Sequence, residues 1–92
     1  MTSKEQVGPL AGIRVLTNEV QLAGPYCSMT LADRGAEVIK IERPKYGDSA
    51  REGAPVLKND EGERVSGYFM RFNRNKRSLT LDLKSEEGLA AF

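Results

Sequence analysis

Histidine is absent from this chain, so the commonest acid-base residue and metal ligand is missing. A single cysteine, Cys27, cannot form a disulfide within the chain, and the N-terminus carries no signal-like apolar stretch. The longest apolar run is only a few residues, too short to cross a membrane. The net charge is +1, so the chain lacks the basic excess of a dedicated nucleic-acid binder. We therefore expect a cytoplasmic protein without a metal site, a membrane segment or a nucleic-acid partner.

Residues 10–44 show the sequence pattern of a strand, a loop, a helix and a second strand. A short apolar run at 13–16 predicts the first strand, a helix is predicted over 25–34, and a β-rich run predicts a second strand at 37–42. Two strands joined through a helix are most simply parallel, with a right-handed crossover. The ligand-facing end of such a unit is the loop after the first strand, here residues 17–24, which we call the mouth loop.

Glycine and proline mark the ends of the predicted helix. Gly24-Pro25 breaks the chain and sets φ for a first helical turn, and Gly35 supplies the left-handed residue after the last turn. Ser28, Ala32 and Gly35 form a strip of small residues, which lets the helix backbone lie close to a sheet. The strip indicates a helix packed on the two predicted strands.

In the second predicted strand, Ile39 and Ile41 alternate with Lys40 and Glu42. Side chains alternate between the two faces of a strand, so the isoleucine face is expected to be the more surely buried one.

The rest of the chain is less regular. Residues 1–8 are polar and aperiodic and are expected to be a flexible lead-in. Residues 43–67 are rich in proline, glycine and charge, which is typical of a lid or binding loop. Residues 68–72 are compatible with a helical turn or a strand, whereas residues 78–83 alternate cleanly and predict a third strand. Ser85 then predicts the N-cap of a helix.

That last helix has barely begun when the chain stops. We therefore expect residues 9–92 to be the N-terminal part of one α/β domain that is truncated at its C-terminal end.

Four residues are isolated candidates for chemistry. Glu42 stands where a dinucleotide-binding fold places its ribose-binding acid, but the three-glycine fingerprint is missing and a solvent-facing glutamate is the simpler interpretation. Cys27 is a nucleophile candidate near a helix N-terminus, against the stronger alternative of a small buried thiol without a histidine to activate it. Glu19 and Asp48 are interpreted as solvated or turn-forming acids.

Cations gather at predicted strand ends and turns, which favours either an anion site or a solvated rim. They are Arg43, Lys45, Arg71, Arg74, Lys76, Arg77 and Lys84. The segment GYFMRFNRNKR also resembles an RNA-binding ribonucleoprotein motif, whose aromatic side chains would be Phe69 and Phe72. That match is poor because Ser66 stands where the motif has a basic residue.

Several motifs in order resemble the N-terminal part of the class III CoA-transferases, the formyl-CoA and carnitine-CoA transferase group. They are PLAGIRVL, AGPYCSMTLADRGAEVIKIERP, GD and R in the long loop, and YFMRFNRNKRSLTLDLKSEEG. The resemblance implies a Rossmann-like parallel α/β sheet within a larger fold of two interlocked protomers, hence a homodimer. It also implies an enzyme that moves coenzyme A from an acyl-CoA donor to a carboxylic acid, with no permanently bound cofactor.

The resemblance assigns no catalytic residue to this chain, since the family's aspartate nucleophile would lie beyond residue 92. It implies coenzyme A contacts at Leu22 and Ala23 in the mouth loop, at Arg43 after the second strand, and at Leu81, Asp82, Leu83 and Lys84 at the end of the third. Leu22 replaces the glutamine of formyl-CoA transferases, which argues against formate or oxalate as substrates.

Two alternatives to a transferase remain at this level. The α-methylacyl-CoA racemases share the fold and much of this N-terminal sequence, but they lack much of the long loop and the YFMRFN segment. A small RNA-binding module or an inactive remnant would be an alternative of another class.

Overall fold

The computed structural model describes residues 7–92 of the chain. Most of the predicted lead-in, residues 1–6, lies outside the described residues. The elements in chain order are β1 (Arg14–Thr17), α1 (Ala23–Asp33), β2 (Glu37–Glu42), the 3-10 helix η2 (Ser49–Glu52), β3 (Val56–Lys58), β4 (Arg64–Ser66), α2 (Gly67–Phe72), β5 (Lys76–Thr80) and α3 (Glu86–Ala91).

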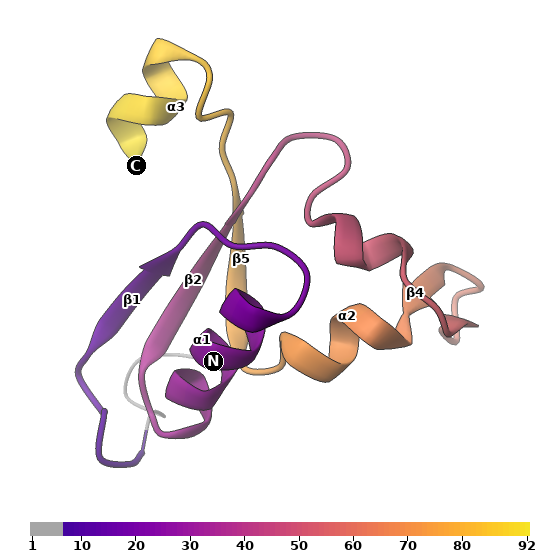
Figure 1. Cartoon of the computed structure of the whole chain (residues 1–92), viewed down its shortest axis with the longest axis horizontal. Helices are drawn as coiled ribbons and strands as arrows, with labels where there is room; N and C mark the ends of the chain where they lie inside the picture. The colour runs from indigo at the N-terminus through magenta and orange to yellow at the C-terminus, as the bar shows by residue number, and fades with distance from the viewer. Residues whose placement is uncertain (1–6) are drawn as a thin grey trace.

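A parallel sheet of order β1-β2-β5 forms the centre of the molecule. Its three arrows point to the same end, toward α3 (Figure 1). Val15 lies opposite Val38 in the first pair of strands, and Glu42 lies opposite Thr80 in the second. The predicted α/β fold with a parallel sheet is therefore confirmed.

Helix α1 joins β1 to β2 and packs on the sheet through small side chains. Its buried residues are Pro25, Ser28, Met29 and Ala32. This helical spacing leaves Cys27 outside the buried stripe, so the thiol is exposed and the prediction of a buried one is wrong. The helix ends as predicted, because Gly35 takes φ +104°.

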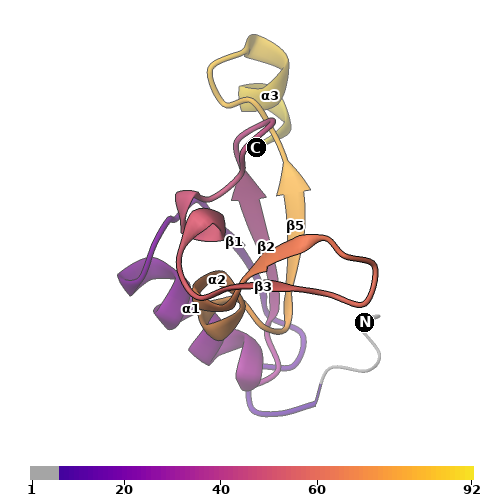
Figure 2. The ribbon, with the colours of Figure 1, turned by 90° about the vertical axis from the view of Figure 1, so that its right-hand side faces the viewer.

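Helix α2 lies beside α1 on the same side of the sheet (Figure 2). Phe72 is buried, and its ring lies 6.1 Å from that of Tyr26 and 5.4 Å from that of Tyr68. The Ser66 hydroxyl accepts a hydrogen bond from the Phe69 amide, which caps the helix. The sequence left this segment undecided between helix and strand, and the cap and the aromatic packing favour the helix.

The third strand is shifted from its prediction, since β5 ends at Thr80 rather than at residue 83. Its partner β2 ends at Glu42, whose carbonyl accepts the last bond of the ladder, from the Leu81 amide. Pro44 follows shortly and has no N–H to extend the pairing.

The long segment 43–67, which its composition predicted to be a lid or binding loop, contains regular structure. It contains η2 and the antiparallel hairpin β3-β4. The hairpin turn is built by Asn59, whose side-chain oxygen accepts from the amides of Glu61 and Glu63. Strands of three residues are too short to show a period in the sequence.

Candidate functional site

Two pockets lie at the carboxyl edge of the sheet, where parallel strands deliver their following loops to one place. The first, which we call the strand-end pocket, has a volume of about 130 Å³. It is lined by Asn18, Ile41, Arg43, Pro44, Leu81, Asp82, Leu83 and Lys84. The second, which we call the mouth pocket, has a volume of about 140 Å³ and shares Asn18, Ile41 and Arg43 with the first. Ligands of open α/β sheets bind at this edge.

Arg43 stands between the two pockets with its guanidinium largely uncommitted. Its Nε donates to the Gly47 carbonyl at 2.8 Å, and the guanidinium carbon lies 5.9 Å from the centre of the Tyr46 ring. Within residues 7–92 this is the one hydrogen bond of the Arg43 side chain. Both Nη groups are therefore available to an anion.

The loop after β5 forms the opposite wall of the strand-end pocket. The Asp82 carboxylate accepts from the Lys84 amide at 3.0 Å, and the Asp82 carbonyl accepts from the Ser85 amide at 3.1 Å. These bonds hold the turn before α3, whose N-cap is Ser85 as predicted. Lys84 is exposed at the pocket.

The structure thus brings together five of the seven residues singled out from the sequence. Leu22 and Ala23 are exposed at the start of α1 and line neither pocket. They continue the mouth loop, of which Asn18 lines both pockets. Asn18 is a pocket residue that the sequence reasoning missed, although its position directly after β1 was a usable signal.

The predicted group of cations does not form one rim. Arg74 pairs with Asp33 at 2.7 Å, and Arg77 pairs with Glu37 at 2.9 Å, both toward the amino-terminal end of β5. The Arg77 and Arg14 guanidinium groups lower the pKa of Glu37, with Arg14 the larger cause. These cations serve structural pairs, and only Arg43 and Lys84 reach the strand-end pocket.

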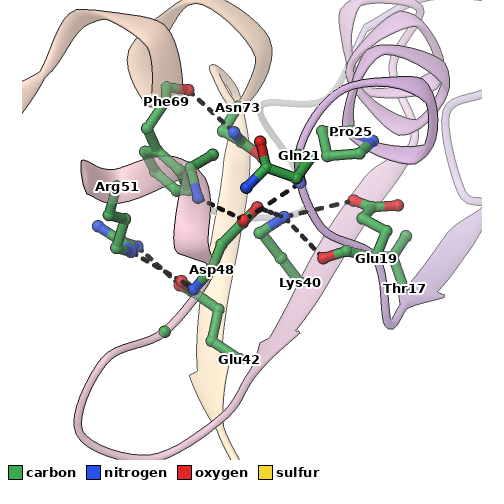
Figure 3. A network of polar contacts seen from close by, with 12 residues as sticks. Thr17, Glu19, Gln21, Pro25, Lys40, Glu42, Asp48, Arg51, Phe69 and Asn73 are labelled. Atoms are coloured by element: carbon green, nitrogen blue, oxygen red, sulfur yellow. Dashed lines mark hydrogen bonds and ion pairs between the residues drawn. The ribbon is translucent and has the colours of Figure 1, made fainter. Parts of the chain in front are cut away.

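A cluster of charged side chains lies beside the mouth loop, on the α1 side of the sheet (Figure 3). We call it the charge cluster, and its members are Glu19, Lys40, Glu42, Asp48, Arg51 and Lys76. Lys40 is 1% exposed and Glu42 is 5% exposed, whereas on the isoleucine face Ile41 is buried but Ile39 is only half-buried. The prediction that the isoleucine face of β2 is the more surely buried one is therefore wrong, because ionic partners from distant segments compensate the charges of the other face.

Glu42 is neither solvent-facing nor free for a ribose. Its carboxylate receives two bonds of 2.7 Å from Arg51, one from the Ser78 hydroxyl and one of 3.0 Å from the Asp48 amide. The Arg51 bonds are the main reason that the pKa of Glu42 is lowered to about 2, against the opposing effect of burial.

Asp48 is turn-forming, as predicted, but buried rather than solvated. Its Oδ1 accepts from the Ala50 amide at 2.8 Å, and its Oδ2 lies 2.9 Å from the Lys40 ammonium. Burial alone would raise the pKa of Asp48, but the Ala50 amide and Lys40 outweigh it, so the pKa is lowered.

Lys76 closes the cluster from β5. Its ammonium donates to Glu19 at 3.2 Å, to the Pro25 carbonyl at 3.0 Å and to the Asn73 side-chain oxygen at 2.8 Å. Burial lowers the pKa of Lys76 despite the nearby Glu19 carboxylate. Glu19, which is mostly buried, is thus paired rather than solvated.

Two negative findings apply to residues 7–92 alone. In this part of the chain no helix is both long and apolar enough to cross a membrane. The same residues contain no group of three or more carboxylate or thiol side chains placed to hold a metal ion.

Comparison with known proteins finds relatives that are named CoA-transferases. The family model described as CoA-transferase family III matches residues 10–92. A protein named succinyl-CoA:mesaconate CoA-transferase from Haloarcula hispanica is 49% identical over 86 residues, covering 94% of this chain and 22% of the relative. A succinate–glutarate CoA-transferase from Agrobacterium fabrum is 48% identical, covering 89% of this chain and 21% of the relative.

A solved structure agrees with these sequence matches. The crystal structure of a CAIB/BAIF family protein from Brucella suis superposes with a TM-score of 0.77 at 46% identity. The match covers 90% of this chain and 22% of that one. The chain therefore spans about a fifth of the length of the relatives it matches, and by sequence and by fold it belongs to CoA-transferase family III.

Proposed function

We propose that the chain supplies part of the coenzyme A site of an enzyme that moves coenzyme A from an acyl-CoA donor to a carboxylic acid. Arg43 and Lys84 come from distant parts of the sequence and line one pocket at the carboxyl edge of the sheet. This proximity is the observation that carries the proposal. Two cations near one site favour an anionic ligand, and coenzyme A carries phosphate groups.

The lining of the strand-end pocket suits one portion of such a ligand. Ile41, Leu81 and Leu83 provide apolar surface beside the two cations. A pocket of about 130 Å³ is smaller than a typical small-molecule site of roughly 300–1,000 Å³, so it would take only part of the carrier. The adjoining mouth pocket would extend the site toward Leu22 and Ala23.

In the proposed reaction, an aspartate from outside this chain attacks the acyl-CoA thioester. The carbon–sulfur bond breaks, coenzyme A thiolate leaves, and a mixed anhydride forms. The thiolate then attacks the aspartyl carbonyl of the anhydride, which releases the donor acid and leaves an enzyme thioester. The acceptor carboxylate then attacks the enzyme thioester and displaces the thiolate, which attacks the acceptor carbonyl of the new anhydride. The new acyl-CoA departs and the aspartate is regenerated. Covalent catalysis of this kind divides one difficult exchange into easier steps.

The names of the relatives extend the proposal to substrates and setting. Both curated relatives are named for succinyl-CoA or succinate and a dicarboxylic acid, which favours succinyl-CoA as donor and a dicarboxylate as acceptor. They are named transferases, which favours transfer over racemisation. We propose a cytoplasmic homodimer of interlocked protomers for the complete enzyme, and no turnover by the 92-residue chain alone.

The alternative of an RNA-binding module has less support in the geometry. Phe72, which would have to stack on a base, is 7% exposed and packs between Tyr26 and Tyr68. Phe69 is half-buried, and the Arg51 guanidinium lies 3.9 Å from the centre of its ring. Neither ring offers a free stacking face.

The test is coenzyme A binding by the intact transferase that contains this sequence. Arg43→Ala should weaken binding roughly tenfold, because a charge-assisted hydrogen bond contributes about 1.5–3 kcal/mol when fully formed and less when exposed. Arg64→Ala is the matched control, since Arg64 is exposed on β4 and lines neither pocket. Calorimetric affinities for Arg43→Ala and Arg64→Ala that agree within twofold would contradict the assignment.

A further inference from the structure

The mouth loop is held at two successive backbone groups by one buried ion pair. The Lys40 ammonium donates to the Glu19 carbonyl at 3.2 Å. The Asp48 carboxylate accepts from the Gln21 amide at 3.2 Å. Lys40 and Asp48 in turn lie 2.9 Å apart (Figure 3). The pair therefore binds the backbone at Glu19 and at Gln21, on both sides of Val20.

Residues 19–21, which the ion pair holds, include a backbone conformation that is unfavourable on its own. Gln21 takes φ +69°, in the left-handed region that residues with a Cβ rarely adopt. Its side chain also donates to the Ser49 hydroxyl, next to Asp48 in η2. A free loop would leave this conformation, because nothing local in the sequence favours it at glutamine.

The pair itself is rigidly placed. The Lys40 side chain is 2% exposed and that of Asp48 is fully buried. Lys40 is fixed in the central strand β2, and Asp48 is fixed as the N-cap of η2 by its bond from the Ala50 amide. Both groups therefore act from elements that do not belong to the mouth loop.

The segment held by the ion pair also borders the mouth pocket. Asn18, Glu19 and Val20 line the mouth pocket together with Arg43. Gln21 directly precedes Leu22 and Ala23, the residues at the start of α1. A change in the backbone at Gln21 would therefore shift Val20, which lines the mouth pocket, and the residues at the start of α1.

We propose that Lys40 and Asp48 are positioning residues, which hold the mouth loop in the conformation that binds the acyl-CoA substrate. The inference rests on the proposed function and adds to it the pair that shapes the site. Asp48 lines the mouth pocket, but its side chain is fully buried and that of Lys40 is 2% exposed, so neither side chain is placed to bind the substrate directly. Each acts through the backbone of residues 19–21.

The first test is Asp48→Asn in the intact transferase. Asparagine keeps an oxygen for the Gln21 amide but removes the charge that holds Lys40. We expect the KM for acyl-CoA to rise about fivefold with kcat within twofold of the wild type, and faster amide exchange in residues 18–24. Asp60→Asn, in the exposed hairpin turn, is the matched control and should change neither quantity.

Two further variants separate positioning from general stability. Adding Gln21→Gly to Asp48→Asn should recover part of the lost affinity, because glycine adopts φ near +69° without strain. Removing both charges together, with Lys40→Met and Asp48→Asn, avoids leaving one buried charge alone and should keep the protein folded. The double variant should show the same rise in KM as Asp48→Asn.

The outcomes distinguish the inference from the function on which it rests. If Arg43→Ala weakens coenzyme A binding while Asp48→Asn and the double variant behave like Asp60→Asn, the positioning role is refuted and the proposed function stands. If neither Arg43→Ala nor the pair variants change binding, both are refuted. A rise in KM that glycine at position 21 partly reverses supports the pair.

Discussion

Replacing Glu42 with glutamine probes how much the charge cluster contributes to stability. The carboxylate is 4% exposed and receives two bonds of 2.7 Å from Arg51. Its pKa falls from 4.5 to about 2, which corresponds to about 3 kcal/mol at roughly 1.4 kcal/mol per unit. Arg51 is 43% exposed, so solvent screening reduces the expected loss to about 2 kcal/mol at pH 7.

The pH dependence provides a second, independent check. A carboxyl group whose pKa is lowered on folding stabilises the fold above its unfolded pKa and loses that contribution as pH falls toward its folded value. The difference in unfolding free energy between wild type and Glu42→Gln should therefore be full above about pH 4.5 and shrink toward pH 2. Urea unfolding followed by circular dichroism at a series of pH values measures it.

Glu61→Gln is the matched control, because Glu61 is exposed in the hairpin turn. It should change the free energy of unfolding by no more than about 0.5 kcal/mol at any pH. The reasoning fails if Glu42→Gln costs no more than Glu61→Gln at pH 7, or if its cost stays constant down to pH 2.

Two smaller predictions concern the carboxyl-terminal end of α1. Gly35→Ala should destabilise the fold by about 2 kcal/mol, because φ is +104° and the new Cβ would lie 2.9 Å from the Val7 carbonyl oxygen. Gly62→Ala, at φ +81° with no atom within 4 Å of the new Cβ, should lose only the stability that the left-handed backbone costs an alanine. Equal shifts of the melting temperature in Gly35→Ala and Gly62→Ala would contradict the predicted steric clash at position 35. Arg74→Ala should raise the pKa of Asp33, since Arg74 is the main cause of its lowering, yet change stability little because the pair is exposed and screened by solvent. An NMR titration of Asp33 that is unchanged by Arg74→Ala would refute the pairing.

Local sequence signals predicted the centre of the fold well. The second strand was predicted at 37–42 and β2 has those bounds, because its β-rich run is bounded by Gly35 before it and Pro44 after it. The first strand and α1 were placed within two residues of their observed ends. Each of these elements is specified by residues within itself or directly beside it.

The errors arose where distant residues decide the outcome. Lys40 and Glu42 were placed on the less surely buried face because charge normally stays in water, but Asp48 and Arg51 follow in the next segment and compensate them. The end of β5 depends on where β2 stops pairing, which the alternation in 78–83 does not reveal. Pairing partners of this kind cannot be found from periodicity.

The candidate site was partly visible in the sequence. Arg43 and the residues 81–84 were singled out by the family resemblance, and they line one pocket. Asn18 was not singled out, since an asparagine after a strand is common in ordinary turns. The contact of Lys40 with the mouth loop is a hydrogen bond to the Glu19 backbone carbonyl. Every residue has such a carbonyl, so no pattern of side chains in the sequence could predict this bond.

The equal numbers of cations and carboxylates in the charge cluster have an evolutionary consequence. Removing Lys40, Asp48 or Arg51 strands an opposite charge away from water, so such single substitutions would lower fitness before a compensating change arrives. Descendants of this sequence should therefore alter the cluster by exchanging partners in pairs, for example Lys40 together with Asp48, or Glu42 together with Arg51. An alignment of many relatives would show these positions changing jointly, while the exposed hairpin drifts one residue at a time.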